Sequence, residues 1–189
     1  MHELEPYFNW RELYVASEDQ ASPFYGRKYS EMYLSNTVYN HYIHPQWDEC
    51  GSSTLYLKIL FVGYDSEYAI IEFIGEWNDV LHNDIMLLYR NVIEELIFND
   101  IKYFILIGEN VFNFHADAND YYEEWFDNIE DGWIAGLGFQ NHVVEEMSSA
   151  NIDYYIALKG EFDEINWRKF MPDQLFEKIS AIMNKRLGA

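Results

Sequence analysis

The sequence contains a single cysteine, and this scarcity excludes several kinds of protein. Cys50 has no second thiol with which to form an intramolecular disulfide, and one thiolate cannot build a multi-cysteine metal site. No obvious positive residue lies near it in the sequence to lower the pKa of its thiol and make it a nucleophile. Cys50 is therefore predicted to be a small packing residue.

Long apolar runs and a basic leader are also missing. The longest apolar runs, such as 103–107, are far too short to cross a bilayer. The first residues have neither the basic nor the apolar stretch of a signal peptide, and lipidation signals are absent from both ends. These absences predict a cytoplasmic protein that does not bind membranes.

Positive charge is scarce, because 12 Lys and Arg residues face 33 Asp and Glu residues, which gives a formal net charge of −21. No Lys or Arg lies between Lys102 and Lys159. Such a chain repels nucleic-acid phosphates, so we expect no direct nucleic-acid binding. A sustained negative potential favours a protein partner with a basic surface, whereas a solvated acidic surface that only maintains solubility is the simpler alternative.

The chain is by contrast rich in the residues that build a core. Hydrophobic residues make up 49% of it and aromatic residues 19%, which is too much for a disordered chain. Its 189 residues fit one compact domain more easily than two. We treat residues 1–50 as a β-rich N-terminal extension, with a hairpin that turns at Ser35 and Asn36, and residues 51–189 as an α/β core.

Strands and helices are predicted to alternate along the core. Apolar and β-branched residues predict strands over 52–62, 68–74, 101–107 and 153–158, with an ambiguous short segment at 133–137. Apolar residues at helical spacing predict helices over 78–98, capped by Asn78 or Asp79, over 117–129 and 139–147, and from Pro172 onward. This order predicts an α/β fold: a mixed, mainly parallel sheet with crossover helices, plus an N-terminal β hairpin layer.

Two groups of residues have the chemistry of a metal or catalytic site. His41, His44, Asp48 and Glu49 are residue types that bind divalent metals, although a regular strand would point the two histidines to opposite faces. His115, Asp117 and Asp120, with Glu109, follow a buried strand at the position where open α/β sheets bind ligands, and they could act as acid and base. Structural or surface histidines and an acidic helix start are the simpler interpretations. Neither a Gly-rich phosphate loop nor a nucleophile elbow is present, so we predict no cofactor and leave an enzymatic role open.

The region 109–133 combines carboxylates with aromatic rings, which are enriched at protein interfaces. We predict that it forms a binding surface, although aromatic residues at helical spacing more often belong to a core. Its members are Glu109, Asp117, Asp120, Tyr121, Tyr122, Glu123, Glu124, Trp125, Asp127 and Trp133.

The order of elements over residues 55–159 resembles that of the STAS domain of anti-sigma-factor antagonists. The shared order is a hairpin, Gly75 after its second strand, a helix, the buried strand 103–107, an acidic segment that opens a helix, and then strand, helix and strand. Members of that family typically carry Asp-Ser-Ser-Gly where this helix opens, with a serine that can be phosphorylated. The nearest stretch here, 117–120, reads Asp-Ala-Asn-Asp and has no serine. The resemblance therefore implies a regulatory or adaptor role in protein binding, and it leaves phosphorylation in doubt.

The leading hypothesis is thus a noncatalytic acidic module that binds another protein. One alternative is an inhibitor that mimics nucleic acid by presenting carboxylates to a basic protein. Another is a metal-assisted hydrolase that uses His115 and Asp117 or the cluster over 41–49. Association between copies of the chain is a further possibility that the sequence leaves open.

Overall fold

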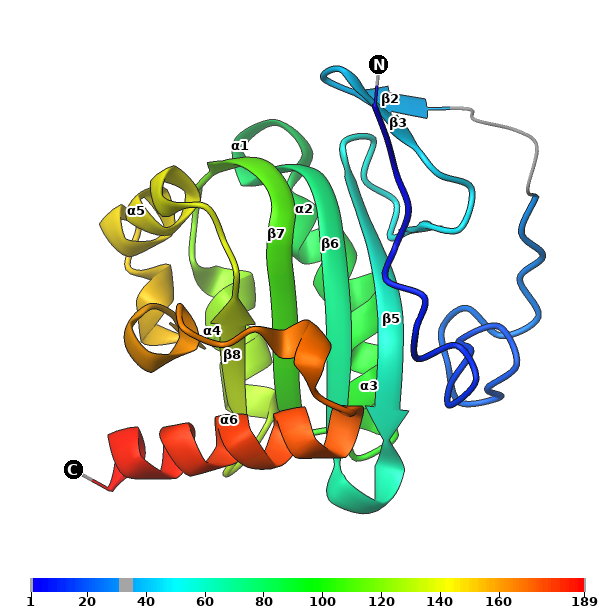
Figure 1. Ribbon diagram of the computed structural model, residues 1–189. Helices are drawn as coiled ribbons and strands as arrows, with labels where there is room; N and C mark the ends of the chain where they lie inside the picture. Colours follow the sequence, from blue (N-terminus) through cyan, green and yellow to red (C-terminus); the bar gives the residue numbers. More distant parts are fainter. Residues whose placement is uncertain (1, 31–35, 189) are drawn as a thin grey trace.

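The computed structural model describes residues 2–30 and 36–188, and its centre is a six-stranded sheet (Figure 1). The strand order is β4-β5-β6-β7-β8-β9. The strands are β4 (Asp48–Glu49), β5 (Leu55–Gly63), β6 (Tyr68–Asn78), β7 (Tyr103–His115), β8 (Trp133–Leu137) and β9 (Ile156–Ala157). Strands β6 to β9 are parallel to one another, and β4 and β5 join them as an antiparallel edge. The predicted α/β class with a mixed, mainly parallel sheet is confirmed.

One face of the sheet is covered by the helices that connect the parallel strands. They are α1 (Asp79–His82), α2 (Asp84–Leu88), the π-helical turn η2 (Tyr89–Ile93), α3 (Glu94–Phe98), α4 (Asp120–Asn128) and α5 (Asn141–Ser149). Their apolar side chains share one core with Leu57, Ile71 and Phe104 of the sheet, which are almost completely buried. This arrangement is expected, because parallel strands require crossover connections that place helices over the sheet.

The opposite face is covered by the two ends of the chain. Helix α6 (Pro172–Leu187) crosses the N-terminal ends of the parallel strands, and the ring of Phe176 stacks on Tyr68 at the start of β6 (Figure 1). The N-terminal segment crosses the same face, where Trp10 lies 5.7 Å from Trp167 between ring centroids. Residues from the N-terminal 50 therefore pack on the main sheet, and the division into an extension over 1–50 and a core over 51–189 stays a prediction.

A small second sheet of β1 (His2–Leu4), β2 (Asn36–Val38) and β3 (His41–Ile43) has the order β1-β3-β2. Strands β2 and β3 form an N-terminal hairpin, but its turn lies at Tyr39 and Asn40, where Tyr39 has a φ of 52°. The turn predicted at Ser35 and Asn36 is wrong at Asn36, which lies in β2 and pairs with Ile43, while Ser35 lies with the rest of 31–35 outside the described residues.

Four predicted elements differ from the structure in extent. The long helix over 78–98 begins as predicted, since the Asn78 side chain accepts from the backbone N of Leu81 at 2.9 Å, but it breaks at Asn83, whose φ is 52°. Strands β6 and β7 are longer than predicted, because they keep pairing to Asn78 and His115 after their apolar runs end. The segment 153–158 is mostly turn, and only Ile156 and Ala157 pair with β8. No helix within the described residues has the length and apolar composition that crossing a membrane requires.

Candidate interaction surface

Helix α4 divides the predicted binding region into a buried face and an exposed face. Tyr122, Trp125 and Ile129 recur at three- and four-residue spacing and are buried against the sheet. The Trp125 ring meets Phe104 of β7 edge-on, with centroids 5.1 Å apart. The Tyr122 hydroxyl donates to Asp79 Oδ2 at 2.7 Å. These aromatic residues therefore fix the helix in place and are not available to a partner.

The exposed face of α4 carries the carboxylates of Asp120, Glu123 and Asp127. Phe126 lies on the same side of the helix and is 41% exposed, which is high for a phenylalanine. Its ring lies 6.1 Å from that of Tyr155, at an interplanar angle of 60°. Helix α4 therefore presents an accessible aromatic ring among acidic side chains.

A turn from a later part of the chain completes this surface. The 3-10 helix η3 (Ile152–Tyr154) buries Ile152 and leaves the Tyr154 side chain 85% exposed. The centroids of the Tyr154 and Tyr155 rings lie 6.2 Å apart, so Tyr155 neighbours both Phe126 and Tyr154. We call Asp120, Glu123, Phe126, Asp127, Tyr154 and Tyr155 the acidic–aromatic patch.

The electrostatics of Tyr155 show that the carboxylates surround these rings. Desolvation raises the pKa of its phenol, and the negative charges of Glu123, Asp127 and Asp120 raise it further. All three carboxylates belong to the exposed face of α4. The patch is therefore a site of concentrated negative potential around an exposed apolar surface.

Two other members of the predicted surface turn toward the neighbouring helix instead. Glu124 accepts from Arg90 Nη2 at 3.0 Å and so forms an ion pair with η2, although Arg90 also pairs with Glu94. The guanidinium of Arg90 also lies over the ring of Tyr121, 5.4 Å from its centroid. Asp117 is exposed in the loop before α4.

Glu109 and Trp133 lie away from the patch. Glu109 accepts at Oε1 from Trp167 Nε1 and Arg168 Nη1, both at 2.9 Å, on the face covered by α6. Trp133 is 4% exposed and belongs to the same core as Trp167. The predicted surface of ten residues is therefore divided between both faces of the sheet, and only Asp120, Glu123 and Asp127 belong to the patch.

The predicted catalytic residues have partners other than each other. His115 Nε2 lies 3.3 Å from Glu76 Oε1 and 2.9 Å from the side-chain nitrogen of Asn113. Asp117 is exposed in the loop, and Asp120 begins α4 beside Tyr155. No contact between His115 and either aspartate is among the interactions of the described residues.

The four predicted metal ligands likewise have different surroundings and do not form one site. The His41 ring stacks on Phe112 with centroids 4.5 Å apart, and His44 Nδ1 accepts from the backbone N of Gln46 at 3.2 Å. Asp48 is fully buried and paired with basic side chains, whereas Glu49 is exposed. Over the described ranges, no three His, Cys, Asp or Glu side chains are arranged to hold a metal ion.

Sequence reasoning missed Phe126, Tyr154 and Tyr155. The run 153–158 has the composition of a strand, which predicts alternating burial and no common surface with α4. Asn151 could have indicated a turn before this run, because asparagine tolerates a left-handed conformation. In the structure its φ is 59° where it precedes η3.

No family model matches the chain, and no curated protein matches it. Among solved structures, the chain is similar to the anti-sigma factor antagonist SpoIIAA in its unphosphorylated form. The identity is 14% and the TM-score 0.42, over 61% of this chain and 98% of that chain. Membership of the STAS family stays a prediction.

Proposed function

We propose that this protein is a noncatalytic interaction module that binds a protein with a basic surface through the acidic–aromatic patch. The observation that supports this function is the 85% exposed ring of Tyr154, beside Tyr155 and the carboxylates of α4. A regulatory or adaptor role in the cytoplasm is the setting that we predict for such a module.

Lysine and arginine side chains match both properties of the patch. Their charged groups are attracted to carboxylates, and their aliphatic stems and cationic ends favour aromatic faces. A partner with basic residues on an exposed helix or loop would place these groups against Glu123 and Asp127 while covering the rings of Phe126 and Tyr154. Tyrosine is among the residues that contribute most to protein interfaces, because its large ring loses little conformational entropy.

The experiment is a pull-down of tagged protein from lysate of its source organism, washed at low and moderate salt and analysed by mass spectrometry. We compare the natural protein with a patch variant, Glu123→Lys with Asp127→Lys. The variant inverts two charges that have no described ion-pair partner, so the fold should survive. We expect one stoichiometric, salt-sensitive partner for the natural protein and a loss of about tenfold or more of it in the variant at low salt.

The matched control is Glu145→Lys with Glu146→Lys, which makes the same charge change on the exposed side of α5. It should capture the partner as the natural protein does. A second variant, Tyr154→Ser, removes the exposed ring without changing charge and should also weaken capture. The proposal is wrong if no partner is captured at either salt, if the patch variant retains it, or if both charge variants lose it equally.

The same experiment separates the alternative of nucleic-acid mimicry. Added duplex DNA should leave the captured partner in place when the patch binds a basic surface that has no affinity for nucleic acid. Displacement of the partner by DNA would identify the protein as a mimic of nucleic acid instead.

A further inference from the structure

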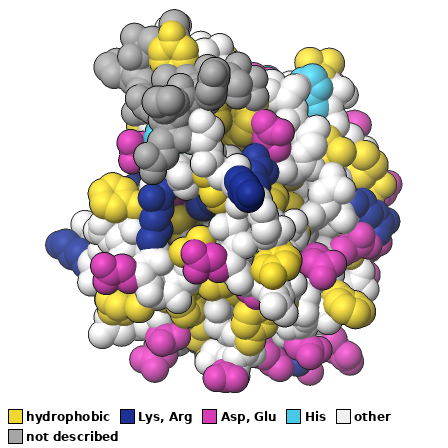
Figure 2. Space-filling model, turned by 90° about the vertical axis from the view of Figure 1, so that its right-hand side faces the viewer, with side chains coloured by type: hydrophobic (Ala, Val, Ile, Leu, Met, Phe, Trp, Pro, Cys, Tyr) yellow, Lys and Arg dark blue, Asp and Glu magenta, His cyan; other side chains and the backbone are white. Residues whose placement is uncertain are grey.

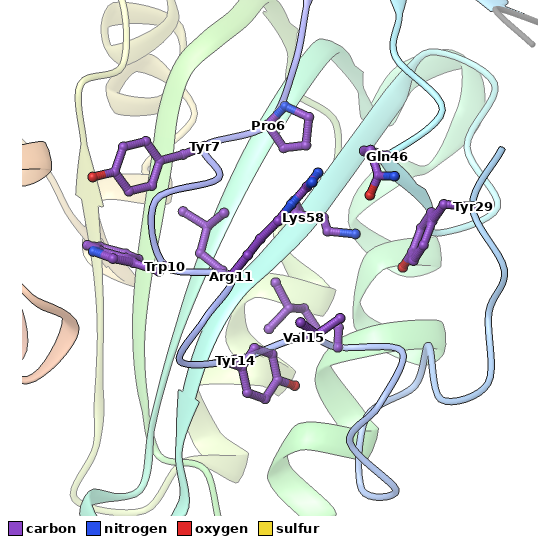
Figure 3. A pocket seen from close by; sticks show the side chains of 12 residues that line it. Pro6, Tyr7, Trp10, Arg11, Tyr14, Val15, Tyr29, Gln46 and Lys58 are labelled. Atoms are coloured by element: carbon purple, nitrogen blue, oxygen red, sulfur yellow. The ribbon is translucent and has the colours of Figure 1, made fainter. Parts of the chain in front are cut away.

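A cavity of about 150 Å³ lies between the N-terminal segment and strand β5, on the side of the sheet opposite α4. Figure 3 shows side chains from four separate parts of the chain around it: Pro6 to Val15, Tyr29, Gln46, and Lys58 of β5. On this side of the molecule, Lys and Arg side chains gather around a hollow (Figure 2). The charged side chains around the cavity are therefore basic, whereas the protein as a whole is acidic.

Lys58 is the buried cation of this cavity. It is 8% exposed, and its Nζ lies 3.1 Å from Asp48 Oδ2 and 3.9 Å from the centroid of the Tyr29 ring. An ammonium group has three donors, so these two contacts leave one for a further acceptor. Burial lowers the pKa of Lys58, Asp48 counteracts this effect, and the positive charges of Arg11 and Arg27 lower it further.

Asp48 is the only carboxylate that the described residues place among these cations, and its oxygens are already occupied. Oδ1 accepts from the Tyr29 hydroxyl at 2.7 Å and lies 3.3 Å from Arg27 Nε, while Oδ2 pairs with Lys58. Arg11 has no ion pair among the described residues, although it lies close enough to affect the pKa values of both Lys58 and Tyr29. Among the residues that the structure describes, three cations with one carboxylate give this region an excess of positive charge.

The lining of the cavity is consistent with this excess. Among the described residues, two basic side chains, Arg11 and Lys58, line the cavity, and no carboxylate does. A lining with basic and no acidic side chains contrasts with the whole chain, which has 33 Asp and Glu residues against 12 Lys and Arg residues. Figure 3 shows the Arg11 side chain alongside Lys58, with its guanidinium directed toward the end of the cavity near Pro6 and Gln46.

The remaining walls are apolar. Ala16, Ile59 and Leu60 are buried at the cavity, and Trp10 and Tyr14 add aromatic surface. An apolar cavity of this volume is large enough to hold a ring the size of benzene. Ligand pockets typically combine such apolar walls with a few polar groups that fix the orientation of the ligand.

We propose that this cavity binds a small organic carboxylate, whose apolar body lies against Trp10 and Leu60 and whose carboxylate is bound by Arg11 and Lys58. The planar guanidinium of arginine suits a carboxylate because it can donate two parallel hydrogen bonds. Figure 3 shows the Gln46 side chain on the same side of the cavity as the end of Lys58. Inorganic phosphate would satisfy the cations but would leave the apolar walls uncovered.

The experiment uses the whole protein and benzoate as the probe, observed by amide ¹H–¹⁵N spectra. We expect saturable shifts centred on the amides of Arg11, Gln46 and Lys58. Benzyl alcohol, which has the ring without the charge, and inorganic phosphate, which has the charge without the ring, should each bind at least about tenfold more weakly. Equal binding of benzyl alcohol would overturn the role of the cations, and equal binding of phosphate would overturn the role of the apolar walls.

Arg11→Gln tests the guanidinium, and its exposure makes the substitution compatible with the fold. We expect at least about a tenfold loss of benzoate affinity, whereas Lys28→Gln, the same charge change on an exposed neighbouring residue, should leave the affinity unchanged. Arg11→Lys keeps the charge but not the paired donors, so it should give an intermediate loss of benzoate affinity. This variant serves as the test if Arg11→Gln fails to fold. The proposal is wrong if no saturable shift occurs at these amides or if Lys28→Gln weakens binding as much as Arg11→Gln.

Discussion

Glu72 offers the sharpest test of the electrostatics of this fold, because it is a carboxylate in the middle of the central strand β6. It is 1% exposed, and its Oε2 accepts from the backbone N of Tyr7 at 2.8 Å. Burial raises its pKa from 4.5 to about 7, while Tyr7 and Arg168 partly oppose the shift and Glu109 adds to it. Between pH 4.5 and about 7, the folded protein therefore keeps a proton on this group that the unfolded chain has lost.

The size of the effect follows from the pKa difference. A shift from 4.5 to about 7 is about 2.5 units, and at 1.36 kcal/mol per unit it corresponds to about 3 kcal/mol. Because the folded pKa is the higher one, this contribution to stability is fully present below pH 4.5 and is lost as the pH rises through about 7. Above pH 7 the native protein therefore carries the full cost of an ionised Glu72.

The variant Glu72→Gln removes this cost while keeping an oxygen that can accept from Tyr7. We expect its free energy of unfolding to exceed that of the natural protein by up to about 3 kcal/mol at pH 8, and by less than about 1 kcal/mol at pH 5, where the unfolded carboxyl group is still partly protonated. Urea denaturation between pH 5 and pH 8, followed by circular dichroism, measures this difference without screening charges. Glu177→Gln, on the exposed side of α6, is the control and should show no such pH dependence. A variant that is less stable than the natural protein at pH 8, or a difference that is constant with pH, would refute the reasoning.

Two further substitutions test the backbone of β6 and the anchor of α4. Gly75 has a φ of +115°, and an added Cβ would lie 2.0 Å from the carbonyl oxygen of Thr54, so Gly75→Ala should cost about 3 kcal/mol or more in urea denaturation. Gly26→Ala, where φ is +74° and the space is open, should cost only about 1–2 kcal/mol, and equal costs would contradict the assigned clash. Tyr122→Phe removes the donor to Asp79, whose pKa burial raises from 3.8 to about 6, and should cost about 1–3 kcal/mol at pH 8. Since the hydroxyl stabilises the ionised form of Asp79, the loss should shrink at pH 5, and an equal loss at both pH values would rule out this origin.

Most of the fold could be predicted because the signals that specify it are local. The apolar run 103–107 predicts a strand buried on both faces, and the spacing of Tyr122, Trp125 and Ile129 predicts a helix with one buried face. Pro172 begins the last helix as its position in the sequence indicates. The ends of elements were less predictable, because β6 and β7 extend through pairing with each other, and this pairing depends on residues far apart in the sequence.

The candidate surface was predictable only in part. The carboxylates of α4 and the absence of Lys and Arg from 103–158 are properties of the sequence. The aromatic half of the patch was not, since Tyr154 and Tyr155 meet Phe126 only because the chain turns at Asn151 and returns beside α4. The spacing of the aromatic residues favoured a core position over a surface position, and the packing buries both Trp125 and Trp133.

The sequence by itself determined the class of fold, the acidity of the chain and the positions of its main helices, because composition and periodicity are carried by neighbouring residues. Only the tertiary structure brought Arg11, Arg27 and Asp48 close to Lys58 and buried Glu72 beneath the N-terminal segment. These groupings join segments that are tens of residues apart, and their charges and pKa values depend on distance and burial in space. The physical reason is that a side chain's electrostatic environment is set by the groups that pack around it, and the order of residues along the chain does not specify that packing locally.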